Sequence, residues 1–280
     1  MLIAQLTDLH VRPPGQACYR VVETTMLAER ALRAVARRPP APDVVLITGD
    51  LTDCGLPEEY GVVATLLRRY AAAPVFCIPG NHDRREAMIA HLPDTRHADG
   101  FVQYAVEDYP VRLIMLDTVV PGHAHGELCA RRLAWLDRTL AARPDRPTII
   151  AMHHPPFICG IGHMDAISLR EPGAFAAVLA RHPQVERVVC GHHHRPVVTR
   201  IARAVVSIAP AVAHQVELDL RPDAPSAFVL EPPAYQLHHW SAEHGLVSHT
   251  AYVEDYPGPF PFVMEPEYPG RATDTNGHRE

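Results

Sequence analysis

The chain has 280 residues, enough for one large domain or a domain with an appendage, and 47% of them are hydrophobic, so a sizeable core can form. Its formal net charge is −6 and it has no stripe of basic residues, which excludes non-specific electrostatic binding of nucleic acid. We therefore expect no nucleic-acid polymer as a partner. No apolar run reaches the ~18 residues of a membrane span, and no basic segment precedes the first apolar run, so we expect a cytoplasmic protein with no membrane partner.

Strand-like runs alternate with helical patterns in the first third of the chain, which is typical of an α/β fold. Pro39 stands where the first helical pattern ends, and Pro57 stands at a plausible first turn of the second. The predicted elements, in chain order, are a strand at 2–6, a helix at 20–38, a strand at 43–48, a helix at 57–72 and a strand at 74–79.

The pattern changes near residue 100. Segments 101–106 and 111–116 flank a turn and predict a hairpin, which suggests a second sheet rather than further parallel units. The elements expected beyond it are a helix at 126–142, a strand at 148–152, a helix at 171–181, a strand at 188–190, a hairpin of 197–201 with 204–208, and strand-like pieces within 227–252. From residue 257 we expect an ordered strap that ends in a frayed terminus.

Five short polar clusters recur along the chain; four of them end an apolar run, and the fourth in chain order follows a more mixed run at 148–152. They are Asp8-Leu9-His10, Gly49-Asp50, Gly80-Asn81-His82-Asp83, His153-His154-Pro155-Pro156 and Gly191-His192-His193-His194. Strands that repeatedly end in Asp, Asn or His deliver oxygen and nitrogen ligands to one edge of a sheet. The candidate metal ligands are Asp8, His10, Asp50, Asn81, His153, His192 and His194. This set contains no thiolate, which suits Mn, Fe, Co or Zn.

Three further residues in these clusters are candidates for catalysis. His82 could stabilise a transition state or protonate a leaving group, and Asp83 could orient it, although a structural hydrogen bond between the two is the alternative. His154, beside the candidate ligand His153, could contact phosphate. Two divalent metals about 3.5–4 Å apart can hold a hydroxide between them and clamp phosphate oxygens, which is the chemistry of phosphoester hydrolysis.

The five clusters, in this order, resemble the signature of the calcineurin-like metallophosphoesterase superfamily, which reads D-x-H, G-D, G-N-H-[DE], H-x-P and G-H-x-H. The resemblance implies a four-layer αββα sandwich. It also implies that one metal is held by Asp8, His10 and His194, that a second is held by Asn81, His153 and His192, and that Asp50 bridges them.

Segments outside the ligands narrow the resemblance to the bacterial branch of class III cyclic nucleotide phosphodiesterases and glycerophosphodiesterases. Matching segments include 49–55, 164–165 and 213–216. Cys54 stands where Ser/Thr protein phosphatases have Arg, and Asp53 stands where purple acid phosphatases have a Tyr ligand, so both of those branches are disfavoured. His193 replaces the Asn usual in close relatives, and we expect it to be a solvent-side or second-shell residue rather than a ligand.

The resemblance implies a dinuclear metal-dependent hydrolase that uses a metal-bridging hydroxide on small phosphodiesters, such as cAMP or glycerophosphodiesters. A phosphomonoesterase, a non-catalytic scaffold protein and a nuclease remain as alternatives. We expect residues 1–210 to form the catalytic domain and residues 211–280 to supply C-terminal strands, a cap and a tail. The C-terminal strands either complete the sandwich or, as the resemblance favours, form a cap through which the protein becomes a homo-oligomer.

Substrate specificity is expected to lie in the loops at about 11–20 and 157–170 and in the C-terminal cap. Tyr19, His163 and Asp165 fall in segments that could overhang the site, and each is expected to support the fold or merely to lie nearby. His214 is one of several remaining histidines that could be surface residues.

Overall fold

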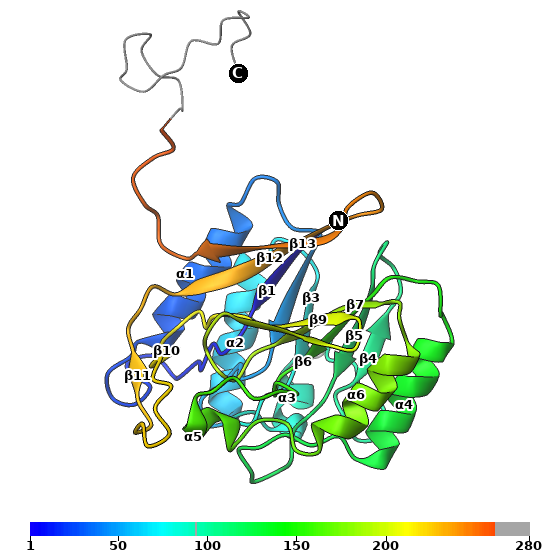
Figure 1. Cartoon of the computed structure of the whole chain (residues 1–280). Coiled ribbons are helices and arrows are strands. Elements are labelled where there is room, and N and C mark those ends of the chain that lie inside the picture. Colours follow the sequence, from blue (N-terminus) through cyan, green and yellow to red (C-terminus); the bar gives the residue numbers. More distant parts are fainter. Residues whose placement is uncertain (93, 261–280) are drawn as a thin grey trace, which may run out of the picture.

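Two β-sheets pack face to face in the computed structural model, and helices cover the outer face of each sheet (Figure 1). The structure describes residues 1–92 and 94–260. This arrangement confirms the α/β fold class and the αββα layering that the sequence pattern and the family resemblance predicted. Among the described residues, no helix combines the length and apolar character needed to cross a bilayer.

The first sheet contains five strands in the order β13-β12-β1-β2-β3. Its parallel part is formed by β1 (Leu2–Leu6), β2 (Val44–Thr48) and β3 (Val75–Ile78), and the antiparallel β12 (Ala234–Ser241) and β13 (Gly245–Tyr252) extend it beyond β1. All residues of β2 are buried, as expected for a parallel strand covered on both faces. The helices on the outer face are α1 (Thr24–Ala36), α2 (Pro57–Tyr70) and α3 (Arg85–His91).

The second sheet contains six strands in the order β4-β5-β6-β7-β9-β8. They are β4 (Tyr104–Val106), β5 (Arg112–Leu116), β6 (Thr148–Met152), β7 (Val185–Cys190), β8 (Val197–Ile201) and β9 (Ala204–Ile208). Side chains alternate along β5: Leu113 and Met115 join the core between the sheets, whereas Ile114 and Leu116 pack in the core beneath α4 (Ala130–Ala141) and α6 (Pro172–Arg181). The remaining elements among the described residues are short: α5 (Gly162–Asp165), β10 (Gln215–Val216) and β11 (Phe228–Val229).

Both predicted hairpins are confirmed, since β4 pairs with β5 and β8 pairs with β9 in antiparallel fashion. Two helices begin about four residues later than predicted. Before α1, a local bridge between Cys18 and Val22 holds the segment outside the helix, and before α4 the tertiary pairing of Gly126 with Leu169 does the same. The short helices α3 and α5 were not predicted. Most of the strap expected from residue 257 lies outside the described residues.

The segment after residue 210 divides its strands between two places. Residues 236–239 of β12 pair with residues 2–5 of β1, for example Leu237 with Ala4, so β12 extends the first sheet. Strands β10 and β11 pair only with each other and form a separate two-stranded sheet. The expected cap and the division at residue 210 stay predictions.

A buried ion pair connects the helices of the two outer layers. The guanidinium of Arg85, at the start of α3, donates two hydrogen bonds to Asp117, at 2.6 Å from Nε and 2.8 Å from Nη2. Asp117 follows β5 and also accepts the backbone N–H groups of Val102 and Val119. Arg132 of α4 places Nη1 4.0 Å from the same carboxylate. Asp117 is completely buried, and among the described residues these partners balance its charge.

We expect Asp117→Ala to lower the free energy of unfolding by about 3–5 kcal/mol, because it leaves two buried guanidinium groups without a carboxylate. Urea denaturation monitored by circular dichroism measures the change. Asp137→Ala is the matched control, since Asp137 pairs with Arg181 at the surface and should lower the stability far less. Equal losses in the two variants would contradict the assigned role of the ion pair.

Candidate metal centre

The seven predicted metal ligands lie together where five parallel strands end. Asp8 and His10 follow β1, Asp50 follows β2, Asn81 follows β3, His153 follows β6, and His192 and His194 follow β7. Six of them are buried and Asn81 is half-buried. Because strands from both sheets end at this edge, residues more than 180 positions apart in the sequence meet, as in the contact of His10 with His194.

The backbone at this edge is in a conformation that L-residues rarely adopt. Asp8, His10, Asp50, His192 and His194 all have positive φ, between 46° and 73°. Each such residue costs on the order of 1–3 kcal/mol and persists only where the surrounding structure enforces it. A ladder of backbone hydrogen bonds does so here, with His10 N–H donating to Asp50 O at 2.9 Å. The strain turns the ligand side chains toward a common centre.

Two glycines permit the close approach of these loops. A Cβ atom on Gly49 would lie 2.2 Å from His153 Nδ1, and one on Gly80 would lie 2.2 Å from Asp50 Oδ1. Gly49 also has a φ of 100°, which other residues adopt only with strain. The two glycines in the Gly-Asp and Gly-Asn-His-Asp clusters are therefore required to bring Asp50 and His153 together.

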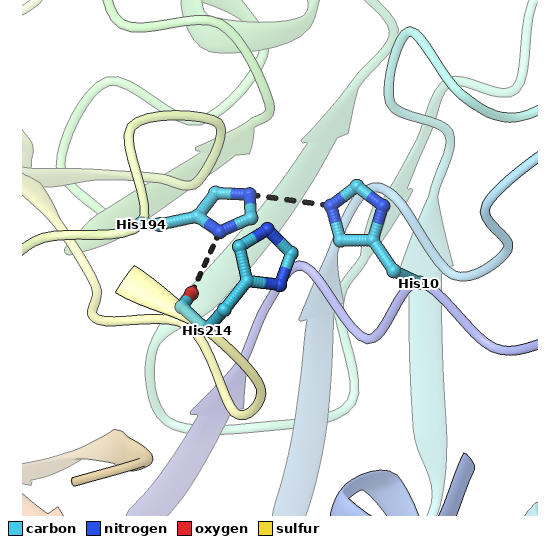
Figure 2. Close-up of side chains that lie close together, drawn as sticks. All are labelled: His10, His194 and His214. Atoms are coloured by element: carbon cyan, nitrogen blue, oxygen red, sulfur yellow. Dashed lines mark hydrogen bonds between the residues drawn. The ribbon is translucent and has the colours of Figure 1, made fainter. Parts of the chain in front are cut away.

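The first group of ligands consists of Asp8, His10 and His194. Figure 2 shows the rings of His10 and His194 facing each other, with 3.2 Å between their Nε2 atoms. His194 Nδ1 donates to the carbonyl oxygen of His214 at 2.9 Å, so a neutral His194 has its lone pair on Nε2, which lies 3.3 Å from Asp8 Oδ1. Burial raises the pKa of Asp8, but the charge of His194 lowers it, and the pKa lies below its ordinary value. An ionised carboxylate and two imidazole nitrogens that converge in this way fit a divalent cation.

The second group consists of Asn81, His153 and His192. His153 Nδ1 donates to Thr48 O at 2.8 Å, and its Nε2 lies 3.1 Å from Asn81 Oδ1. His192 Nε2 donates to Ile167 O at 3.0 Å, which leaves Nδ1 as its free nitrogen. Backbone carbonyls thus fix the orientation of both rings, as is common for histidine ligands of metals.

Asp50 lies between the two groups. Its Oδ2 atom is 3.7 Å from His10 Nε2 and 3.3 Å from His153 Nε2, while Oδ1 accepts the backbone N–H of His82 at 2.9 Å. Burial raises the pKa of Asp50, but the charges of His153 and His82 lower it more, so the pKa lies well below its ordinary value. A carboxylate that faces both groups can contact two cations at once.

His82 presents a free nitrogen to the site. Its Nδ1 atom donates to the carbonyl oxygen of Asp53 at 2.7 Å, so Nε2 is available for a ligand. The contact that orients the ring thus comes from Asp53, not from Asp83 as the sequence suggested. The Asp83 carboxylate accepts hydrogen bonds from Leu51 N–H, at 3.1 Å, and from the hydroxyl of Tyr60, at 3.0 Å, and so fixes the loops beneath the site. Burial and the neighbouring Asp50 raise the pKa of Asp83 to about 6.

His154 lies behind the centre with both ring nitrogens engaged. Nε2 donates to Ala124 O at 3.1 Å, and Nδ1 accepts the hydroxyl of Thr118 at 2.7 Å. The side chain is completely buried, and this burial holds its pKa well below the ordinary value. The ring therefore supports the loop 118–126 and has no nitrogen left to meet a phosphate.

His214 is the residue that sequence reasoning missed. It is 3% exposed rather than a surface residue, and its ring centroid lies 4.6 Å from that of His194 and 5.4 Å from that of His10 (Figure 2). The match of segment 213–216 to the family was the signal that could have identified it.

A cavity of about 430 Å³ opens over the two groups. Asp50, Asn81 and several of the histidine ligands line it, together with His82 and His214. Tyr19 and Phe228, whose rings stack 5.3 Å apart, form a wall, and His163 also lines the cavity, whereas Asp165 does not. Its volume is that of a small-molecule site.

Comparison with known proteins agrees with this geometry. The model of the family described as calcineurin-like phosphoesterase matches residues 1–196. The chain belongs to this family. It is therefore a hydrolase, as predicted, and the family uses divalent metals.

Three relatives carry informative names. The probable glycerophosphodiester phosphodiesterase GpdQ of Arcobacter nitrofigilis is 37% identical, over 95% of this chain and 98% of that protein. The glycerophosphodiester phosphodiesterase GpdQ of Enterobacter lignolyticus is 32% identical, over 93% and 94%. The 3',5'-cyclic adenosine monophosphate phosphodiesterase CpdA of Escherichia coli K12 is 33% identical, over 69% of both chains.

Among solved structures, a dimetal phosphatase from Danio rerio matches with a TM-score of 0.63 at 16% identity, covering 91% of this chain and 99% of that one. At this identity the match shows a shared fold.

We expect Gly80→Ala to weaken the binding of divalent metal by about 10–100-fold, because the new methyl group would displace Asp50. Isothermal titration calorimetry with Mn²⁺ measures the affinity of each protein for the metal. Gly61→Ala is the matched control: Gly61 lies in α2, and a Cβ atom there would meet no atom within 4 Å outside its own helix, so the metal affinity should not change. Wild-type affinity in a folded Gly80→Ala protein would show that the close packing against Asp50 is dispensable.

Proposed function

We propose that the protein is a dinuclear metal-dependent phosphodiesterase that acts on small phosphodiesters. The observation that carries the proposal is the position of Asp50, whose Oδ2 atom faces His10 at 3.7 Å and His153 at 3.3 Å. In the proposed centre, Asp8, His10 and His194 would hold one cation, Asn81, His153 and His192 would hold a second, and Asp50 would contribute to both. The metals are Fe, Mn, Zn or Co, since the set consists of oxygen and nitrogen donors.

Two divalent cations bound there would activate a shared water molecule and neutralise charge on the phosphate. The chain itself supplies a proton to the leaving oxygen. His82 is placed for this task, because its Nδ1–H bond to Asp53 O leaves Nε2 directed to the cavity that it lines. Without metal, burial lowers the pKa of His82, but the charge of Asp50 and the bond to Asp53 raise it above the ordinary value.

A small diester is the substrate class that the cavity supports. A volume of about 430 Å³ holds one small molecule, and its aromatic wall of Tyr19 and Phe228 offers an apolar surface to the organic part of an ester. The relatives named above as glycerophosphodiester and cAMP phosphodiesterases point to the same class. The net charge of −6 disfavours a nuclease, and the complete ligand set favours an enzyme over a non-catalytic scaffold.

We also propose a homo-oligomer that forms through the C-terminal segment. Tyr252 and Tyr256 are more than half exposed there, at 54% and 57%. Exposed aromatic side chains are enriched in protein interfaces.

The metal-loaded enzyme is expected to hydrolyse bis-p-nitrophenyl phosphate faster than p-nitrophenyl phosphate, and to hydrolyse glycerophosphocholine or cAMP. Asp50→Ala should lower both the turnover and the bound metal, measured by absorbance and by atomic emission. The exposed Asp145→Ala is the control and should change neither. A preference for the monoester would favour a phosphomonoesterase, and full activity of Asp50→Ala would refute the centre.

The role of His82 predicts a dependence on the leaving group. His82→Ala should lower kcat for glycerophosphocholine by about 10²–10⁴-fold, because an alkoxide needs a proton to leave. The loss should be much smaller for bis-p-nitrophenyl phosphate, whose leaving phenolate is stable, and the metal content should not change. The exposed His249→Ala serves as the control. Equal losses on both esters would rule out proton donation by His82.

A further inference from the structure

A second cluster of potential ligands lies beside the proposed centre and takes no part in it. Cys159, Asp165 and His193 each offer one ligand atom, and these atoms lie within 4.8 Å of one another. Cys159 and Asp165 belong to the loop 157–170, and His193 is the middle histidine of the Gly-His-His-His cluster.

His193 has a ring nitrogen without a partner. The side chain is completely buried, which excludes the solvent-side position that the sequence left open. Since the hydroxyl of Ser168 donates to Met164 O at 3.3 Å, it accepts a hydrogen bond from His193 Nε2 at 3.0 Å. The lone pair of a neutral His193 is therefore on Nδ1, which has no hydrogen-bond partner among the described residues. A buried, unsatisfied polar atom costs about 1–3 kcal/mol and calls for an explanation.

The other two residues are held in place before any ligand binds. Asp165 accepts the backbone N–H groups of Cys159 and Gly160, one on each carboxylate oxygen and both at 2.8 Å. Each oxygen keeps a further lone pair. The loop is anchored by a small apolar cluster in which Ile161 and Met164 pack against Val216 of β10. Ordered ligands of this kind lower the entropic cost of binding an ion.

We propose that Cys159, Asp165 and His193 bind a zinc ion at a third metal site. Thiolate, imidazole and carboxylate are all zinc ligands, and three protein ligands leave the fourth tetrahedral position to water. Ligand atoms on tetrahedral zinc stand about 3.5 Å apart, so the cluster needs to contract by at most about 1.3 Å. The thiolate distinguishes this site from the dinuclear centre, which contains only oxygen and nitrogen donors.

The position of the site gives the ion a structural role. In the sequence, His193 lies between the proposed ligands His192 and His194. The loop 157–170, which carries Cys159 and Asp165, lines the cavity through His163, Met164 and Ile167. A zinc ion would tie the loop that forms one wall of the cavity to the strand end that carries two ligands. The proposal rests on its own residues and stands whether or not the dinuclear centre hydrolyses diesters.

Cobalt substitution tests the site without an activity measurement. Protein loaded with Co²⁺ alone should bind three equivalents and show the near-ultraviolet charge-transfer absorption of a cobalt thiolate. Cys159→Ser and, independently, His193→Asn should each lose this absorption and one equivalent of metal, while two equivalents remain. Using both variants covers the case in which one of them fails to fold.

Cys18→Ser is the informative control, because Cys18 also lies near a histidine and a carboxylate, His10 and Asp53. This variant should keep the thiolate absorption, and so should Cys54→Ser, which removes an exposed thiol. A wild-type protein without thiolate absorption would overturn the proposal. The proposal would also be overturned if the thiolate absorption were lost in Cys18→Ser and kept in Cys159→Ser.

Discussion

Asp50 holds one carboxylate oxygen toward His10 and His153 at once, and this double contact constrains both sheets. Asp50 and His10 follow strands of the first sheet, whereas His153 follows a strand of the second. The ends of β1, β2 and β6 must therefore stay within a few ångström of one another. Face-to-face packing with these strands ending at the same edge satisfies this condition, and the glycines before Asp50 and Asn81 remove the side chains that would keep the loops apart.

A polar connection inside the core keeps the strand ends in register. The Gln5 amide of β1 donates to Thr48 Oγ1 of β2 and to Cys190 O of β7, both at 3.0 Å. His238 of β12 approaches Gln5 Oε1 at 3.1 Å, and Thr48 O orients His153. Because a buried polar group without its partner is costly, this network favours one alignment of the two sheets. The C-terminal strand β12 therefore contributes to the site from a distance.

The sequence was sufficient for the features that depend on local pattern. The alternation of strands and helices, both hairpins and the meeting of the seven ligands were predicted from apolar runs, turn signals and the polar residues that follow the runs. The partner of each side chain was not accessible in this way, because it is set by tertiary contacts. Asp53 rather than Asp83 orients His82, since the loop after β2 brings its carbonyl within 2.7 Å. From the sequence, His214 could be a surface histidine. In the structure, the turn after β9 places its ring against that of His194. The helix α3 has only seven residues, too few to show a helical period.

The charges of the centre explain why cations belong there. Asp8 and Asp50 are buried, and without a cation their charges must be balanced by protons on histidine. Burial alone would lower the pKa of His153, but Asp50 raises it to about 9, and Asp8 likewise raises the pKa of His194. With its folded-state pKa raised, a protonated His153 contributes stability that is complete below its unfolded pKa and is lost as the pH rises through about 9. A divalent cation takes over this role by displacing the protons, so metal binding strengthens as the pH rises. The same carboxylates are thus paired with protonated histidines at lower pH and with metal at higher pH, which couples the stability of the strand ends to occupation of the site.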